Sequence, residues 1–156
     1  MVSINPYLNF NGNTEEAFHF YKSVFGGEFS VLMRNDSAPA EYPIPESDQD
    51  KIMHIALPLG NGTVLMGSDT LESMEQHLVT GNNFSITIST ESEAETDKLF
   101  ESLSADGQVT MPLEKVFWGS YFGCLTDKYG IQWMLSYDYP QPTAADATFS
   151  EQKAVV

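Results

Sequence analysis

Apolar and polar residues alternate along several short stretches of this chain, which is typical of strands with one buried face. The alternation is clear over residues 83–90, where Phe84, Ile86 and Ile88 are separated by small polar residues. Turn residues separate the stretches, for example Gly60-Asn61-Gly62. Strands are therefore predicted at residues 3–10, 28–35, 51–59, 63–68, 83–90, 108–115, 117–126 and 131–137.

Two further stretches carry apolar residues at i, i+3, i+4 and i+7, which is the spacing of an amphipathic helix. The first is predicted over residues 14–25, with Asn13 as its N-cap and Glu16 completing a capping box. The second begins with a capping box formed by Ser92 and Glu95. Each helix therefore has one apolar face to bury.

The order of the predicted elements repeats along the chain. One strand, one helix and three strands occupy about residues 3–70, and the same order returns over about 83–137. We therefore predict an α+β fold in which two βαβββ modules form a curved, cup-shaped mixed sheet with both helices on its outer face. The two modules are expected to form a single domain over residues 1–140, and residues 141–156 are expected to be a weakly ordered tail.

The most aromatic part of the chain is the stretch 117–135, which contains both tryptophans, Trp118 and Trp133. It is predicted to be a hairpin whose turn lies at residues 127–130. Alternation places Trp133 on the face beneath the helices and Met134 on the face toward the cup.

The stretch 36–50 is different, because it carries three prolines and five acidic residues without any periodicity. It is predicted to be a long surface loop. Such loops are either binding segments or plain solvent-exposed connections, and the sequence leaves both open.

Charge and cysteine content exclude several classes of function. The chain has 22 Asp plus Glu against 7 Lys plus Arg, a net charge of −15, which disfavours nucleic acids and anionic membranes as partners. The single cysteine, Cys124, excludes an intramolecular disulfide and a multi-thiolate zinc site, and it fits a reducing compartment. We expect a cytoplasmic protein without a signal peptide or a membrane span.

Three segments of the chain resemble the PhnB-like group of the vicinal oxygen chelate superfamily, which includes glyoxalase I, bleomycin-resistance proteins and extradiol dioxygenases. They are residues 6–13 leading to Phe20-Tyr21, the pair Phe117-Trp118, and residues 126–130 leading to Trp133-Met134. The resemblance covers roughly residues 3–140 and implies a homodimer with a cup-shaped sheet. In the metal enzymes of this superfamily, it further implies a divalent ion that binds two vicinal oxygens.

The ligand positions of those metal enzymes can be carried over to this sequence. They fall at or near Asn5, Met66, Asn83 and Met134, and none of the four is His or Glu. Thioethers are poor ligands for Mg²⁺, Mn²⁺, Zn²⁺ or Fe²⁺, and two amide oxygens do not replace the lost charge. The usual metal site is therefore expected to be absent and no cofactor is predicted, with a divalent metal ion as the alternative.

Two residues are candidates for catalysis. His54 lies opposite the apolar face of its predicted strand, so it is either a general base or ligand-orienting donor in the cup, or a hydrogen-bonded wall residue. Glu114 is either a buried acid/base group or an exposed carboxylate at a strand end. The residues predicted to contact a small molecule are Asn5, Tyr7, Met66, Asn83, Trp118, Tyr121, Gln132 and Met134. For the aromatic members, core or dimer packing is the competing interpretation.

Three functions are compatible with these features. The first is a metal-free cup that binds a small organic molecule, and the second is a lyase, isomerase or dioxygenase with an unconventional metal site. In the third, the cup is filled by its own side chains. PhnB-like proteins have also been labelled 3-demethylubiquinone methyltransferases. Methyl transfer is disfavoured because the Gly60-Asn61-Gly62 turn joins two predicted strands and opens no helix for a nucleotide cofactor.

Overall fold

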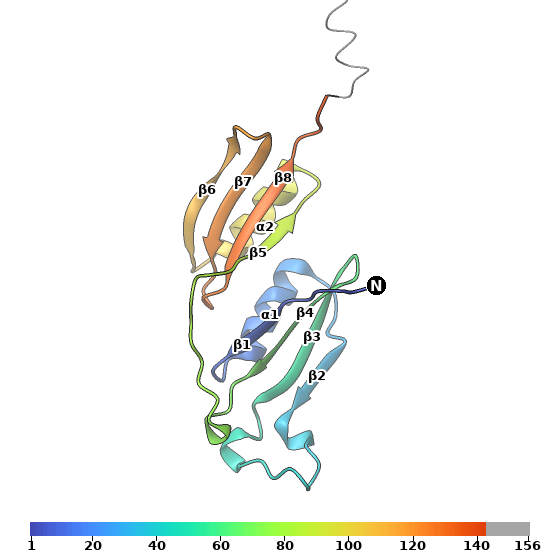
Figure 1. Ribbon diagram of the computed structural model, residues 1–156, viewed down its shortest axis with the longest axis vertical. Helices are drawn as coiled ribbons and strands as arrows, with labels where there is room; N and C mark the ends of the chain where they lie inside the picture. Colours follow the sequence, from blue (N-terminus) through green and yellow to red (C-terminus); the bar gives the residue numbers. More distant parts are fainter. Residues whose placement is uncertain (143–156) are drawn as a thin grey trace, which may run out of the picture.

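The computed structural model describes residues 1–142 and contains two βαβββ modules (Figure 1). Module one consists of β1 (Tyr7–Phe10), α1 (Thr14–Phe25), β2 (Val31–Arg34), β3 (Ile52–Gly60) and β4 (Thr63–Asp69). Module two consists of β5 (Ile86–Ser89), α2 (Glu93–Ser104), β6 (Gln108–Val116), β7 (Ser120–Thr126) and β8 (Gln132–Asp138). The predicted α+β class and the repeated order of elements are confirmed. From residue 143 onward, the predicted tail lies outside the described residues.

Each module forms its own four-stranded mixed sheet, in the order β1-β4-β3-β2 and β5-β8-β7-β6. In both sheets the first strand of the module runs parallel to the last one, and the other pairs are antiparallel. Within residues 1–142, no strand pairing joins the two sheets, so the predicted curved surface consists of two neighbouring sheets. The first strands, β1 and β5, lie at the junction of the modules (Figure 1).

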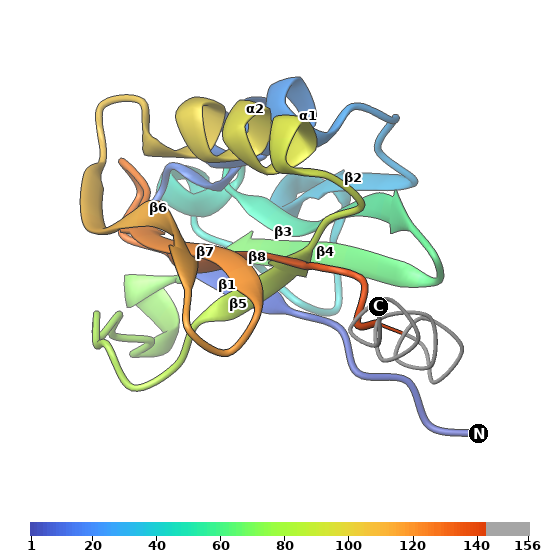
Figure 2. The same cartoon turned by 90° about the horizontal axis from the view of Figure 1, so that it is seen from above.

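Both helices lie on the same side of the sheets (Figure 2). The opposite side, which no helix covers, is called the open face below. The hydrophobic core lies on the helix side and includes Leu8 and Phe10 from β1 and Trp133 and Leu135 from β8. Helix α1 packs so closely on β4 that a Cβ atom at Gly67 would lie 2.7 Å from the Phe18 ring. Among the described residues, no helix is both long and apolar enough to span a membrane.

Two predicted strands start later than expected. The β6–β7 turn contains Phe117, Trp118 and Gly119, and β7 begins only at Ser120, because Gly119 adopts a positive φ of 93°. In module two, β5 begins at Ile86, so Asn83 precedes the strand. The prediction that Phe117, Trp118 and Asn83 lie within strands is wrong.

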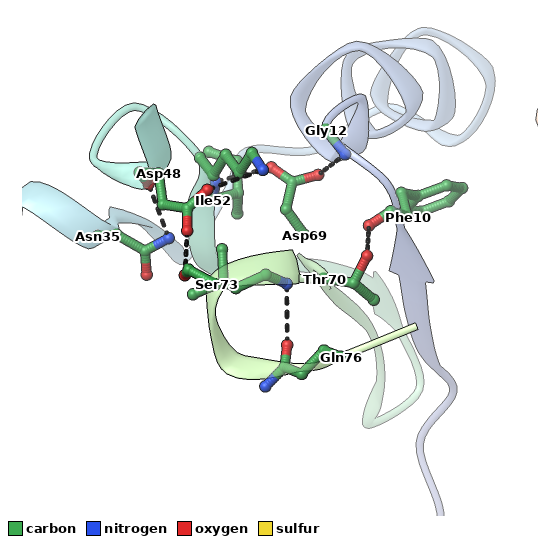
Figure 3. A network of polar contacts seen from close by, with 11 residues as sticks. Phe10, Gly12, Asn35, Asp48, Ile52, Asp69, Thr70, Ser73 and Gln76 are labelled. Carbon is green, nitrogen blue, oxygen red and sulfur yellow. Dashed lines mark hydrogen bonds and ion pairs between the residues drawn. The ribbon is translucent and has the colours of Figure 1, made fainter. Parts of the chain in front are cut away.

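The long loop between β2 and β3 is anchored near its end. It contains two short 3₁₀ helices, η1 (Asn35–Ser37) and η2 (Glu46–Asp48). The buried Asp48 carboxylate accepts a hydrogen bond from the Ser73 hydroxyl and lies 2.9 Å from Lys51 Nζ (Figure 3). The hydrogen bond from Ser73 is the main reason that the pKa of Asp48 is lowered, and the contact with Lys51 lowers it further. The loop is therefore fastened to the segment after β4, whose short 3₁₀ helix is η3 (Glu72–Met74).

The N-terminus of α1 is capped from β4 and not by its own N-cap residue. Asp69 Oδ1 accepts a hydrogen bond from Gly12 N at 3.0 Å (Figure 3). It also accepts from Thr14 N at 3.1 Å and from Thr14 Oγ1 at 2.6 Å. Asp69 Oδ2 accepts another from Ile52 N at 2.8 Å. The side chain of Asn13 makes no capping bond, so the predicted Asn13–Glu16 capping box is wrong. In module two the predicted cap is confirmed, because Ser92 Oγ accepts from Glu95 N at 3.1 Å.

A second buried carboxylate, Asp127, joins the two modules. Its Oδ2 accepts hydrogen bonds from Tyr21 Oη of α1 at 2.7 Å and from Trp133 Nε1 of β8 at 2.8 Å. Its Oδ1 accepts from the backbone N–H groups of Tyr129 at 2.8 Å and Ile131 at 3.0 Å. Burial and Asp127 together raise the pKa of Tyr21, so that hydroxyl remains a donor. One carboxylate therefore closes the β7–β8 turn of module two and holds it against the helix of module one.

We predict that Asp69→Ala lowers the free energy of unfolding by about 3 kcal/mol, because it leaves several buried donors without an acceptor. Asn13→Ala is expected to change it by less than about 0.5 kcal/mol. Urea denaturation followed by circular dichroism measures both. If Asn13→Ala were the more destabilising of the two, the assignment of Asp69 as the cap would be incorrect.

Tyr21→Phe is predicted to destabilise the protein by about 2 kcal/mol, because it removes a buried hydrogen bond to a charged acceptor. Tyr121→Phe is the matched control, since Tyr121 Oη also donates to an aspartate, Asp97, at 2.8 Å but near the surface. The control is expected to cost less than about 0.5 kcal/mol. Equal losses in the two variants would contradict a special role for the contact between modules.

Candidate functional site

The open face of the first sheet carries a tyrosine–histidine pair. Tyr7 on β1 and Met66 on β4 are partners in register, and Met66 is in turn paired with Ala56 on β3. The Tyr7 and His54 rings are stacked, with centroids 5.7 Å apart and an interplanar angle of 18°. Tyr7 Oη and His54 Nδ1 are 3.3 Å apart, within hydrogen-bonding distance.

This pair lies on the face predicted for it. Leu8 and Phe10, which alternate with Tyr7, are buried on the helix side, whereas Tyr7 remains 44% exposed. An aromatic ring, an imidazole and the neighbouring thioether of Met66 are therefore within reach of solvent on one surface. Such a surface can stack against a planar group and exchange a hydrogen bond with it.

The open face of the second sheet combines apolar and polar side chains. Met134 on β8 is the register partner of Cys124 on β7, and Glu114 on β6 is the partner of Phe122. The neighbours of Cys124, Gly123 and Leu125, are buried on the helix side. Burial raises the pKa of the Cys124 thiol, so it is held in its neutral form. This surface offers thioether, thiol and aromatic groups, with Glu114 on the edge strand.

Two of the predicted contact residues already have structural partners. Asn5 Oδ1 accepts a hydrogen bond from Val64 N at 2.9 Å, which holds the chain before β1 against β4. Gln132 Nε2 donates to the Phe84 carbonyl at 3.0 Å and thereby ties β8 to the segment before β5. Both side chains stabilise the fold at the positions where ligand contacts were predicted.

Three other predicted residues lie apart from the tyrosine–histidine pair. Asn83 is exposed in the segment between the modules. Tyr121 extends toward α2, where its hydroxyl donates to Asp97. Trp118 is 54% exposed in the β6–β7 turn, with its ring centroid 5.8 Å from that of Phe122. Of these three, Trp118 is the one associated with an open-face side chain.

The two candidate catalytic residues are not brought together within one chain. His54 is on β3, and strands β4 and β1 separate it from the module junction. Glu114 is on β6, beyond β5, β8 and β7 on the other side of that junction. Neighbouring strands are spaced about 4.8 Å apart, so five intervening strands keep the two side chains out of contact.

Sequence reasoning missed Phe122, which joins Trp118 on the open face of sheet two. The signal was available, because Phe122 alternates with Gly123 and Leu125 in the same way that Met134 alternates with its buried neighbours. It also missed that Asp127 and Asp69 position the surfaces. That role depends on contacts across 106 and 55 residues of sequence, respectively, which no local pattern encodes.

Comparison with known proteins identifies relatives over nearly the whole chain. The sequence profile of the family described as 3-demethylubiquinone-9 3-methyltransferase matches residues 2–136. The crystal structure of protein PA1353 from Pseudomonas aeruginosa is similar with 35% identity and a TM-score of 0.78, covering 88% of this chain and 98% of that one. A putative 3-demethylubiquinone-9 3-methyltransferase, PhnB protein, from Bacillus cereus is 31% identical with a TM-score of 0.68, covering 87% and 99%.

A more distant structure shares the fold. A glyoxalase/bleomycin resistance protein/dioxygenase family enzyme from Burkholderia phytofirmans PsJN is 14% identical with a TM-score of 0.57, covering 86% of this chain and 97% of that one. At this level of identity the likeness concerns architecture and not activity.

Proposed function

Because this chain belongs to the 3-demethylubiquinone-9 3-methyltransferase family and to its PhnB-like group, within the glyoxalase/bleomycin resistance/dioxygenase superfamily, we propose that it binds a small organic molecule on its open face. The proposed site contains Tyr7, His54 and Met66 on the first sheet. Met134, Phe122 and Trp118 are proposed as a separate contact surface on the second sheet, because several strands lie between them and His54. Binding is proposed to occur without the divalent ion used by metal-dependent relatives of this fold.

The stacked Tyr7–His54 pair is the observation that carries this proposal. Two ring systems with polar edges sit on a sheet surface that no helix covers, and their hydroxyl and imidazole nitrogen contact each other. Ligand sites typically combine apolar walls with a few polar groups that fix orientation. Here the rings and Met66 supply the wall, and the Tyr7 hydroxyl and His54 imidazole supply the polar groups.

The donor atoms at the four family positions do not fit a hard divalent ion. Met66 and Met134 offer thioether sulfur, and Asn5 Oδ1 is already bonded to a backbone N–H. Asn83 lies before β5 and outside the sheet. Within residues 1–142, no group of three or more His, Cys, Asp and Glu side chains is placed to hold a metal ion.

The enzymatic alternatives have less support. A lyase, isomerase or dioxygenase that uses both His54 and Glu114 would need the two side chains near one substrate. Five strands lie between them across the two sheets of one chain. Methyl transfer, which the family description names, is not assigned either. Gly60, Asn61 and Gly62 all have positive φ and connect β3 to β4, so this turn opens no helix toward a nucleotide cofactor.

Self-association and location remain part of the proposal. Phe117 and Trp118 are 98% and 54% exposed at one hairpin tip, which supports a homodimer that covers them. The single free cysteine supports a reducing compartment such as the cytoplasm. The net charge of −15 supports a partner other than nucleic acid or an anionic membrane.

Methionine-methyl NMR tests the proposed site, because Met66 lies within it and its methyl signal reports on a bound compound. A library of small aromatic and heteroaromatic compounds is screened against protein labelled with ¹³C at the methionine methyl groups. We predict that a bound compound shifts the Met66 signal and leaves that of Met74, on η3, unchanged. His54→Ala is expected to weaken its affinity about tenfold, because one polar contact is lost.

Glu114→Gln is the matched control and is expected to bind the same compound with unchanged affinity. If no compound perturbs Met66, or if the His54→Ala variant binds as well as the native protein, the proposed site is wrong. Circular dichroism of each variant establishes that the fold is retained.

A further inference from the structure

A separate cavity lies where the two modules meet. It has a volume of about 280 Å³, is open to solvent, and is lined by β1 with the turn after it, by the segment 78–84 that links the modules, and by the β7–β8 turn. Tyr7 borders both this cavity and the open-face pair, whereas His54, Met66 and Met134 do not line the cavity. It is therefore a second, distinct hollow whose walls come from both modules.

The cavity has an apolar wall and an amide wall. Phe84 and Leu78 from the linking segment and Tyr129 and Ile131 from module two provide the apolar side. Asn9, Asn11 and Asn13 line it from module one, and all three are exposed. Across the described part of the chain, none of these three side-chain amides is hydrogen bonded to another protein group. Their donors and acceptors are available to a ligand.

Asn13 is available because Asp69 has replaced it as the cap of α1. The Asp69 carboxylate accepts from both Gly12 N and Thr14 N, which are two of the backbone donors at this end of the helix. A negative charge is therefore already in place at the helix N-terminus. An anionic ligand would find these two donors occupied, and the charge of the nearby buried Asp69 would oppose its approach.

None of the residues that line this cavity is acidic, basic or histidine, within residues 1–142. This is specific to the cavity, because a larger groove of about 510 Å³ at the same junction includes Glu91, Glu95 and Lys98 in its walls. The Tyr129 hydroxyl donates to Glu16, and burial raises the pKa of Tyr129 to about 12, so this residue also remains neutral. A charged ligand would lose hydration here without gaining an opposite charge.

We infer that this cavity binds a neutral, planar compound that carries a carboxamide or lactam group. The planar part packs against Phe84 and Ile131, and the amide of the ligand pairs with the asparagine amides. A carboxamide both donates and accepts, so it matches another carboxamide in a way that a carboxylate or an ammonium group cannot. This inference is independent of whether a ligand binds at the Tyr7–His54 pair.

Benzamide, benzoate and benzylamine are the matched probes, because they share a ring and differ in one group that is neutral, anionic or cationic at pH 7. Each is titrated into ¹⁵N-labelled protein, in which asparagine side-chain NH₂ signals are observed directly. Benzamide is expected to shift the signals of Asn9, Asn11 and Asn13 and to bind about tenfold more tightly than benzoate or benzylamine.

Asn13→Ala is expected to weaken benzamide binding about fivefold while leaving the unfolding transition unchanged, since Asn13 does not cap the helix. Asn61→Gly is the control: it removes an amide in the β3–β4 turn, where φ is 50°, and should not affect binding. His54→Ala should also bind benzamide normally, which separates this site from the one on the open face.

Equal affinity for benzamide and benzoate would overturn the inference, as would full affinity in Asn13→Ala. Benzamide-induced shifts confined to residues around His54 and Met66 would place binding at the other site and would equally exclude this one.

Discussion

A buried carboxylate, Asp127, determines how the two modules of this protein meet. It accepts four hydrogen bonds, three of them from module two and one from Tyr21 of module one. A buried charge is tolerated only when it is paired or fully hydrogen bonded, so these donors are held in fixed directions around it. The Tyr21 ring then packs against the rings of Tyr129 and Trp133, with centroid distances of 6.2 and 5.7 Å. The junction is thus specified by one polar centre within an aromatic cluster.

The two sheets share no strand pairing among the described residues, so their relative placement depends on this junction. The relative placement of the two sheets matters for function, because both proposed binding surfaces depend on the junction between the modules. The open face is divided between the modules, and the amide-lined cavity is built from segments on both sides. In module one, the Asp69 carboxylate has a comparable structural role, because it caps the start of α1. The Asn13 side chain is therefore not used as a cap and lines the cavity.

Much of the fold could be predicted from the sequence, and the candidate site only in part. Periodicity gave α1 its observed bounds, and it gave β4 and β8 to within one residue, because buried faces impose a regular spacing. Prediction from periodicity failed where a backbone conformation or a residue distant in sequence determines the local structure. Gly119 turns the chain before Ser120, and Asp69 takes over the capping of α1 from 55 residues away. Alternation placed Tyr7 and His54 on one surface, but no local pattern could show that Asn5 and Gln132 are bonded to the backbone or that Tyr121 extends toward α2. The ligand contacts assigned to these residues remain predictions.

We propose that the open face binds its ligand with organic side chains alone and holds no divalent metal. Metal content tests it most directly: purified protein and the His54→Ala variant are equilibrated with Mn²⁺, Ni²⁺ or Zn²⁺ in turn, freed of unbound ion, and measured by mass spectrometry. We predict far less than one ion per chain, with no difference between the two proteins. One tightly held ion per chain in the native protein that is lost in His54→Ala would show that the open face is a metal site.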